Sequence, residues 1–394
     1  MTASSSAVPR RFAAASGALG AVAGITEVLE FLLPLWAGTK LGLSGLATGA
    51  LLATSLAVAF SARFLVGVLT DKLERRWLAA AGGIVIAVGL GAYALSETLA
   101  QALVAAVLFG LGDALFTIPA RAMAAESVHD DENAFATVTK SEGTGIWVAY
   151  IVGLSLLPIT DYAGLFLIGA VTAVLAAAFV ASAPSRQTSA PPERRGHQTR
   201  TMRRLLVVVA ITAAVETAAS LILLLRLTRD LQLELGSIVM VFLPGLIAYS
   251  LAPGLAPWLS RRFGRGRTMA LSLLVSAVAV SGLTLAPNLT VIAGFWVLTC
   301  VSWAVSNPVE TTIVSLLSGA ALGRGLTRYE SAALLGAAAG SLASGWAFDS
   351  LMPWAQAVSG AVLLIACATL AVRTMRGQPV DVVAISRPVA VSQP

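Results

Sequence analysis

Two glutamates, Glu27 and Glu30, lie inside an apolar stretch that is long enough to cross a membrane. A charged side chain at the centre of a membrane helix costs at least ~2.5–3.5 kcal/mol, so such residues usually have a function. Their spacing in the chain places both carboxylates on one face of a helix. When two carboxylates lie this close, one of them is suited to hold a proton near neutral pH, and the negative charge of the pair also attracts a cation. The pair is therefore predicted to bind protons and a cationic compound, unless one glutamate pairs with a neighbouring helix.

Three more acids, Asp113, Glu216 and Glu310, also occupy apolar stretches. Asp113 follows Gly110 and Gly112, and this small-residue face lets another helix approach closely. An acid-rich set of this kind could attract an organic cation, release protons, or do both. Each of the three could instead form a structural ion pair, and the residues alone leave these alternatives open.

The basic residues inside the apolar stretches are Arg63 and Arg121. Either guanidinium could hold an anionic group of a substrate, and Arg121 could instead extend to the membrane interface. Aromatic rings can stack on a flat or cationic ligand. Three of them are candidates for the same substrate site, namely Phe31, Trp147 and Trp303.

The composition indicates how these residues are positioned. Of 394 residues, 57% are hydrophobic and only 12% are charged, whereas soluble domains have about 25% charged residues. A membrane helix needs about 20 mostly apolar residues. Twelve stretches meet or approach that length, so we expect an all-α membrane protein with twelve transmembrane helices. We place them at 14–37, 44–68, 77–97, 101–124, 136–158, 162–183, 204–226, 236–258, 268–287, 289–316, 328–347 and 355–375.

Lys and Arg residues divide unevenly between the loops on the two sides of these helices. Cytoplasmic loops carry an excess of such residues. One set of loops holds the basic clusters at 72–76 and 186–204, whereas the other set holds only Lys40, Arg226 and Arg229. The asymmetry predicts a multi-pass protein of the plasma (cytoplasmic) membrane with both termini in the cytoplasm.

One long polar stretch divides the chain into halves. Its composition is that of a flexible linker, although a basic patch that binds lipid is an alternative. The predicted domains are a cytoplasmic tail at 1–13, an N-terminal six-helix bundle at 14–183, a cytoplasmic linker at 184–203, a C-terminal six-helix bundle at 204–375 and a cytoplasmic tail at 376–394.

The loop from Gly67 to Arg76 carries a recognisable pattern. It falls where the second helix should end, and its informative positions are Gly67, Leu69, Asp71, Lys72, Arg75 and Arg76. These positions fit the pattern Gly-x-Leu-Ala-Asp-Arg-x-Gly-Arg-Arg, so the loop resembles the signature of the major facilitator superfamily. Thr70 is a mild change, and Glu74 stands where that family prefers glycine.

The two halves of the chain also repeat. Pro119 corresponds to Pro308, and Glu216 lies within one residue of the position that repeats Glu27. The repeat indicates two six-helix bundles related by an axis along the membrane normal, as in this superfamily. The resemblance implies a substrate site near the membrane midplane between the bundles, which rock around it.

The resemblance also gives the loop a mechanical role. Asp71 would cap the N-terminus of the helix at 328–347, where exposed N–H groups and the helix dipole favour a carboxylate. Arg75 would pair with Glu126, with Asp130 as the reserve. These contacts would close the cytoplasmic side and break during the transport cycle, although an ordinary topology-setting loop is the alternative. The predicted gating residues are Gly67, Asp71, Lys72, Arg75, Arg76 and Glu126.

The resulting hypothesis is a secondary transporter that exports a small amphiphilic or cationic compound in exchange for protons. Proton-linked uptake or exchange of a polar or anionic metabolite, held by Arg63 and Arg121, is one alternative. A non-transporting membrane sensor or scaffold is another. The sequence has no Gly-x-x-x-x-Gly-Lys-Ser/Thr loop, so we expect a proton gradient rather than ATP as the energy source.

Several other classes of function are not expected. His129 and His197 are isolated in polar loops, while Cys300 and Cys367 lie in apolar stretches, so neither a metal site nor a disulfide framework is indicated. The net charge of +6 resides in loops without interleaved aromatic residues, which argues against nucleic acid. We expect no enzymatic activity and no cofactor. The expected partners are a small-molecule substrate and the lipid bilayer, and the expected state is a monomer.

Overall fold

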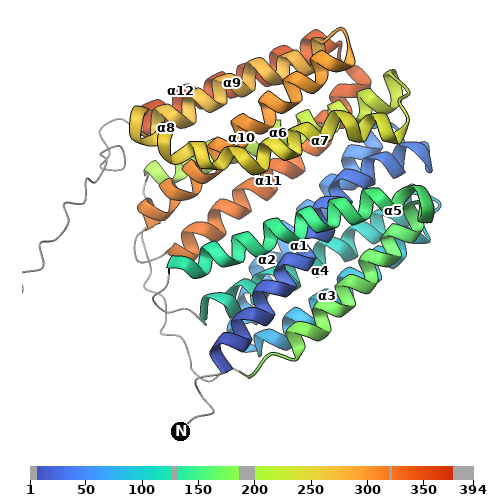
Figure 1. Ribbon diagram of the computed structural model, residues 1–394, viewed down its shortest axis with the longest axis vertical. Helices are drawn as coiled ribbons and strands as arrows, with labels where there is room; N and C mark the ends of the chain where they lie inside the picture. The colour runs from blue at the N-terminus through green and yellow to red at the C-terminus, as the bar shows by residue number, and fades with distance from the viewer. Residues whose placement is uncertain (1–6, 127–131, 186–199, 319–321, 376–394) are drawn as a thin grey trace, which may run out of the picture. The chain divides into compact units, whose positions relative to one another are not determined.

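The computed structural model describes residues 7–126, 132–185, 200–318 and 322–375, and every regular element in these ranges is helical (Figure 1). The first part contains α1 (Ala7–Thr39), α2 (Gly45–Lys72), α3 (Arg75–Ala94), α4 (Leu99–Glu126) and α5 (Glu132–Ala181). Next come α6 (Arg200–Leu225), the π-helix η1 (Arg226–Asp230), α7 (Leu235–Leu251), the 3-10 helix η2 (Ala252–Gly254) and α8 (Leu255–Phe263). The last part contains α9 (Arg265–Leu285), α10 (Leu289–Ser318), α11 (Leu322–Ser350) and α12 (Pro353–Met375).

The helices form two compact units. The first unit comprises residues 1–192, 220–234 and 337–351, and the second comprises 193–219, 235–336 and 352–394. The first unit thus contains α1 to α5 together with η1 and the second half of α11. Most of α6, α7 to α10 and α12 belong to the second unit.

The helix α5 accounts for the difference between the predicted and the observed number of spans. It has 50 residues, or about 75 Å of helix at 1.5 Å per residue, far more than the ~30 Å hydrocarbon core requires. Asp161 interrupts it with a non-helical φ of 59° and ψ of 178°, and the chain turns back on itself there (Figure 1). Eleven helices of the described ranges could span a membrane by length and composition. The helical elements of the described ranges confirm the all-α prediction. Because α5 covers two of the predicted spans, these eleven helices are consistent with the twelve predicted spans.

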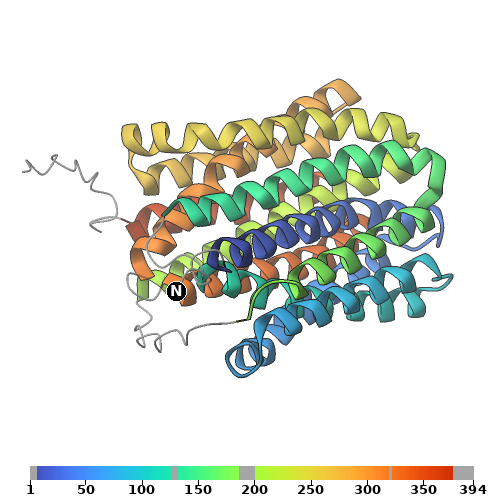
Figure 2. The same ribbon diagram turned by 60° about the horizontal axis from the view of Figure 1, so that its bottom comes forward.

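Close helix packing explains how α1 is held in the first unit. In both views α1, in dark blue, lies against the two arms of α5, in green (Figures 1 and 2). A Cβ atom added to Gly145 of α5 would overlap the carbonyl oxygen of Gly20 on α1. A Cβ atom at Gly24 would lie 2.5 Å from the carbonyl oxygen of Gly145. Small residues at these crossings let the two backbones approach, as is usual between membrane helices.

The second unit is held by a group of aromatic side chains. Trp296 of α10 packs against Phe242 of α7, with ring centroids 4.8 Å apart, and donates its indole N–H to the Phe242 carbonyl oxygen at 3.1 Å. Trp303, further along α10, donates its indole N–H to Ser276 Oγ at 3.0 Å. These bonds satisfy both indoles in a buried environment and fix α7, α9 and α10 together.

Large apolar side chains cover much of the outer surface. Phe64 is 70% exposed, Ile159 78% and Leu95 80%. A soluble protein seldom exposes so many large apolar residues, whereas lipid tails solvate them. The surface therefore agrees with the helix lengths in indicating a multi-pass membrane protein.

Candidate functional site

The two glutamates of α1 lie on an exposed face of the first unit. Both Glu27 and Glu30 are exposed. Within the described ranges, neither side chain takes part in a hydrogen bond or an ion pair. Glu30 lies near enough to Glu27 and to Asp113 of α4 for the three carboxylates to interact electrostatically. The structure therefore brings together the three acids that the sequence placed in the N-terminal bundle.

Aromatic side chains from α1 and α5 lie beside these acids. Tyr150 of α5 donates its hydroxyl to the carbonyl oxygen of Glu27 at 3.3 Å. Phe31 is buried and packs edge-on against Tyr150, with ring centroids 6.1 Å apart. Trp147, one turn before Tyr150, is half-buried. The acids thus have an apolar, aromatic border on the α5 side.

The arginines of the first unit differ in what they contact. Arg121 of α4 forms an ion pair with Glu142 of α5, with Nη2 and Oε1 3.1 Å apart. Arg63 of α2 is half-buried. Because the charge of Arg121 is already balanced by a carboxylate, this residue is less suited to hold an anionic substrate than its sequence position indicated.

The second unit holds another pair of acids, in a different environment. Glu310 of α10 is only 2% exposed, and its Oε2 accepts a hydrogen bond from the hydroxyl of Tyr329 on α11 at 3.2 Å. Glu216 of α6 is half-buried and lies near enough to Glu310 for electrostatic repulsion. Within the described ranges, Oε1 of each glutamate is buried and has no hydrogen-bond partner. This pair is more enclosed than the acids of α1.

The other candidates in the second unit have structural contacts. Trp303 is 7% exposed and packs edge-on against Trp296 at 5.9 Å, in addition to its bond with Ser276. Asn307, one turn before Glu310, donates its side-chain amide to the hydroxyl of Tyr249 on α7 at 2.9 Å. Polar groups therefore continue along α10 from Glu310 towards Tyr249.

The loop between α2 and α3 connects to α4 through Arg75. This side chain is buried, and its guanidinium donates to the carbonyl oxygens of Thr70 at 3.3 Å and Ala122 at 3.2 Å. Ala122 lies one turn before Glu126, so Arg75 does reach the end of α4. The side chains of Asp71 and Glu126, and the whole of Asp130, lie outside the described part of the structure.

The other loop residues contact groups near them. Arg76 forms an ion pair with Glu74 at 2.8 Å and donates to the carbonyl oxygen of Ala183 at 2.8 Å. Glu74, which replaces the glycine of the family pattern, therefore has a local partner. Lys72 is exposed, and a Cβ atom at Gly67 would meet nothing within 4 Å. Gating by these residues stays a prediction.

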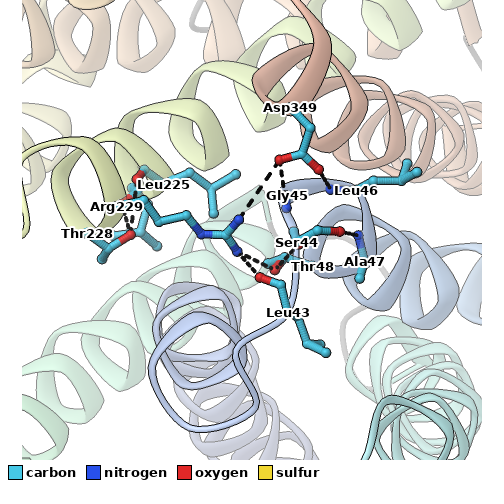
Figure 3. Close-up of polar contacts among 11 residues, drawn as sticks. Leu43, Ser44, Gly45, Leu46, Ala47, Thr48, Leu225, Thr228, Arg229 and Asp349 are labelled. Atoms are coloured by element: carbon cyan, nitrogen blue, oxygen red, sulfur yellow. Dashed lines mark hydrogen bonds and ion pairs between the residues drawn. The ribbon is translucent and has the colours of Figure 1, made fainter.

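A further polar cluster lies at the other end of α2 (Figure 3). Asp349 of α11 accepts hydrogen bonds from the backbone N–H groups of Gly45 at 3.0 Å and Leu46 at 2.8 Å. The first N–H groups of a helix lack partners within it, so Asp349 acts as a cap. Arg229 of η1 lies 4.0 Å from Asp349 Oδ1 and donates to Thr48 Oγ1 at 3.3 Å.

The backbones of α2 and α11 approach closely beside this cluster. A Cβ atom at Gly49 would overlap the carbonyl oxygen of Ser341, and one at Gly345 would overlap that of Gly45. Arg229 also donates to the carbonyl oxygen of Leu43 (Figure 3). All these residues belong to the first unit. The α2 start is thus fixed by an acid, a base and a glycine crossing.

The sequence alone did not point to Tyr249, Asn307, Tyr329 or Asp349. One signal was present for Asn307, which precedes Glu310 by one helical turn and so shares its face. A carboxylate at a helix end, such as Asp349, is a general candidate for capping. The tyrosines carry no such signal because their partners are distant in sequence.

The chain resembles a known family in its sequence and solved transporter structures in its fold. The helical units are those of a membrane transporter fold, and the model of the Major Facilitator Superfamily matches residues 15–242 and 205–390. The chain belongs to this superfamily, whose members are transporters. No curated protein sequence matches the chain.

Solved structures of the same fold are distant in sequence. A bacterial homologue of the human lysosomal transporter Spinster, inward-facing and unoccupied, has a TM-score of 0.79 and 15% identity, over 94% of this chain and 97% of that one. The nucleoside transporter NupG, in a mutant form, has a TM-score of 0.72 and 14% identity, over 94% and 100%. The human organic anion transporter MFSD10 has a TM-score of 0.66 and 16% identity, over 94% and 100%. At these identities the likeness establishes the fold alone.

Proposed function

We propose that this protein exports a small cationic or amphiphilic compound in exchange for protons, by alternating access of its two bundles. The observation that carries the proposal is the group of three acids in the first unit. Glu27 and Glu30 are exposed, and Asp113 lies within electrostatic range of Glu30. Exposing two carboxylates to lipid would be costly, so this face adjoins a water-accessible space in the proposed cycle.

The border of this group fits an amphiphilic cation. The carboxylates attract the charge, and Phe31, Trp147 and Tyr150 offer apolar surface and aromatic faces next to it. In the proposal Glu27 and Glu30 bind the cation and Asp113 supports them. The loop from Gly67 to Arg76 opens and closes the cytoplasmic side, and both termini lie in the cytoplasm.

The competing function is uptake or exchange of a polar or anionic metabolite. NupG and MFSD10, by their names, transport nucleosides and an organic anion, and Arg63 and Arg121 would be the residues that hold such a compound here. The ion pair between Arg121 and Glu142 weighs against this assignment, because a substrate anion would have to compete with a carboxylate that is already bound.

The test measures proton movement in everted vesicles that carry a pH gradient. A panel of lipophilic cations and polar metabolites is added to wild type, Glu27→Gln and Glu30→Gln, with Glu97→Gln as a matched control because Glu97 lies in an exposed loop. We expect a cation to release protons in wild type and Glu97→Gln but to fail in Glu27→Gln or Glu30→Gln. Substrate-driven proton movement in the opposite direction, or none while a compound is still transported, would contradict antiport.

A further inference from the structure

We propose that Glu216 and Glu310 form a site that binds one proton, with the Glu310 carboxyl group oriented by Tyr329. This inference deepens the proposed function, since it assigns the coupling proton to the second unit and leaves the cation to Glu27 and Glu30. It rests on the geometry of four helices, α6, α7, α10 and α11.

No positive charge compensates the carboxylates of Glu216 and Glu310 among the described residues. Glu310 is 2% exposed, and one oxygen of each carboxylate is buried without a hydrogen-bond partner among the described residues. A buried ion costs several kcal/mol unless it is paired and hydrogen-bonded. Within the described ranges neither glutamate forms an ion pair. A proton or a small cation must therefore accompany this pair.

Among the described residues, the titratable side chains near Glu216 and Glu310 are tyrosines and cysteines. Cys300 of α10, Tyr329 of α11 and Cys367 of α12 interact electrostatically with the pair, and Tyr249 of α7 interacts with Tyr329. Tyrosine and cysteine side chains carry no positive charge in either protonation state. These surroundings thus supply no cation to neutralise the carboxylates, and a proton is the smallest one that can enter.

A hydrogen bond from Tyr329 fixes the carboxylate of Glu310. Tyr329 donates to Oε2 of Glu310, so Oε1 is the oxygen left to carry a proton. Two carboxylates that repel each other take up protons as a coupled pair rather than as independent groups. One proton on this pair would therefore remove one of the two repelling charges.

Polar side chains near Glu310 could carry a proton to and from the pair. Tyr249 is 39% exposed, accepts a hydrogen bond from Asn307 and interacts electrostatically with Tyr329. Asn307 and Glu310 lie one turn apart on α10. Tyr249, Asn307 and Tyr329 therefore offer hydroxyl and amide groups for proton exchange between a partly exposed tyrosine and the buried pair.

The experiment uses the full-length protein in nanodiscs and reads the infrared C=O absorption of protonated carboxyl groups at neutral pH. We expect wild type and Glu97→Gln to show the same absorption, and Glu216→Gln and Glu310→Gln each to lose the part that this pair contributes, since Glu27 and Glu30 can also hold a proton. Tyr329→Phe should keep it but shift the pH at which it disappears. An unchanged absorption in the Glu216→Gln, Glu310→Gln double variant would overturn the proposal.

Two further measurements separate this inference from the proposed function and from a metal-ion site. Tetraphenylphosphonium should still bind Glu310→Gln with wild-type affinity but should no longer release protons. If it does not bind wild type at all, the proposed function fails while the infrared result still decides the proton site. If sodium ions abolish the absorption in wild type at neutral pH, and radioactive sodium binds wild type but not the double variant, the pair is a sodium site and the proton assignment is wrong.

Discussion

The acids of the two units share a residue type but not an environment. Glu27 and Glu30 are exposed on α1, whereas Glu310 is sealed within the second unit and hydrogen-bonded to Tyr329. Glu27 and Glu216 nevertheless stand at nearly repeated positions of the two halves. The two halves therefore carry an acid at nearly the same position along a helix, but these acids differ in how exposed they are. In our proposals the exposed acids of α1 bind the cation, and the more buried pair of the second unit binds the proton.

The largest expected effect is on the affinity for a lipophilic cation. A close charge pair in an interface is worth about 1.5 kcal/mol or more, so Glu27→Gln or Glu30→Gln should weaken binding of tetraphenylphosphonium by about tenfold or more. Glu216→Gln and Glu310→Gln should leave it unchanged. Equilibrium binding to the protein in nanodiscs measures both. Equal losses in all four variants would remove the contrast between the units.

A smaller effect should follow from disturbing the helix crossing that supports the exposed acids. Gly145→Ala adds a methyl group that overlaps the Gly20 carbonyl oxygen, and overpacking of this kind typically costs about 1–3 kcal/mol. We expect a lower unfolding temperature and weaker cation binding, with the infrared absorption of the second unit retained. Gly143→Ala, on the same helix with nothing within 4 Å of the added atom, is the matched control and should be neutral. A similar loss in both variants would show that the crossing is not responsible.

The next effect concerns the cap on α2, which also lies in the first unit. Asp349→Ala leaves the N–H groups of Gly45 and Leu46 without their acceptor, and loss of a helix cap costs about 0.5–2 kcal/mol. Asp349→Asn retains an acceptor and should lose less. Thermal unfolding in detergent compares the two. A cation affinity that falls together with stability would mean that the two ends of the unit are coupled.

The smallest effect is expected at the pair of Arg121 and Glu142. The arginine side chain is 41% exposed, and a pair of this kind is worth about 0.2–1 kcal/mol. A double-mutant cycle with Arg121→Gln and Glu142→Gln should therefore give a small coupling energy in thermal unfolding. A coupling well above that range would indicate that Arg121 is held rigidly, which would strengthen its role in the first unit.

The sequence predicted the helical spans well because hydrophobic length and loop charge are local properties. The break between the predicted spans 136–158 and 162–183 falls at Asp161, where α5 turns. The high cost of a charge in a span likewise pointed to Glu27, Glu30, Asp113, Glu216 and Glu310. The cost of a charge depends on the depth of the residue in the membrane and does not indicate which side chains contact it.

The contacts that distinguish these acids could not be predicted in this way. Tyr329 reaches Glu310 from another helix, and neither periodicity nor composition relates the two. Arg229 was interpreted only as one of the few basic residues on its side of the membrane, yet it lies beside Asp349 and Thr48. Such contacts depend on which helices become neighbours, and a single sequence does not encode this in any local pattern.

The cap on α2 has a consequence for how the protein is made. Asp349 is 304 residues further along the chain than Gly45, which is roughly 15 to 60 s of synthesis at about 5–20 residues per second. During that interval Ser44, which accepts from the Ala47 N–H at 3.1 Å, is the cap that the described residues offer to the start of α2. The cap on Gly45 and Leu46 therefore forms only after the penultimate helix has emerged. A chain truncated before α11 should leave its α2 end exposed to the quality-control proteases of the membrane.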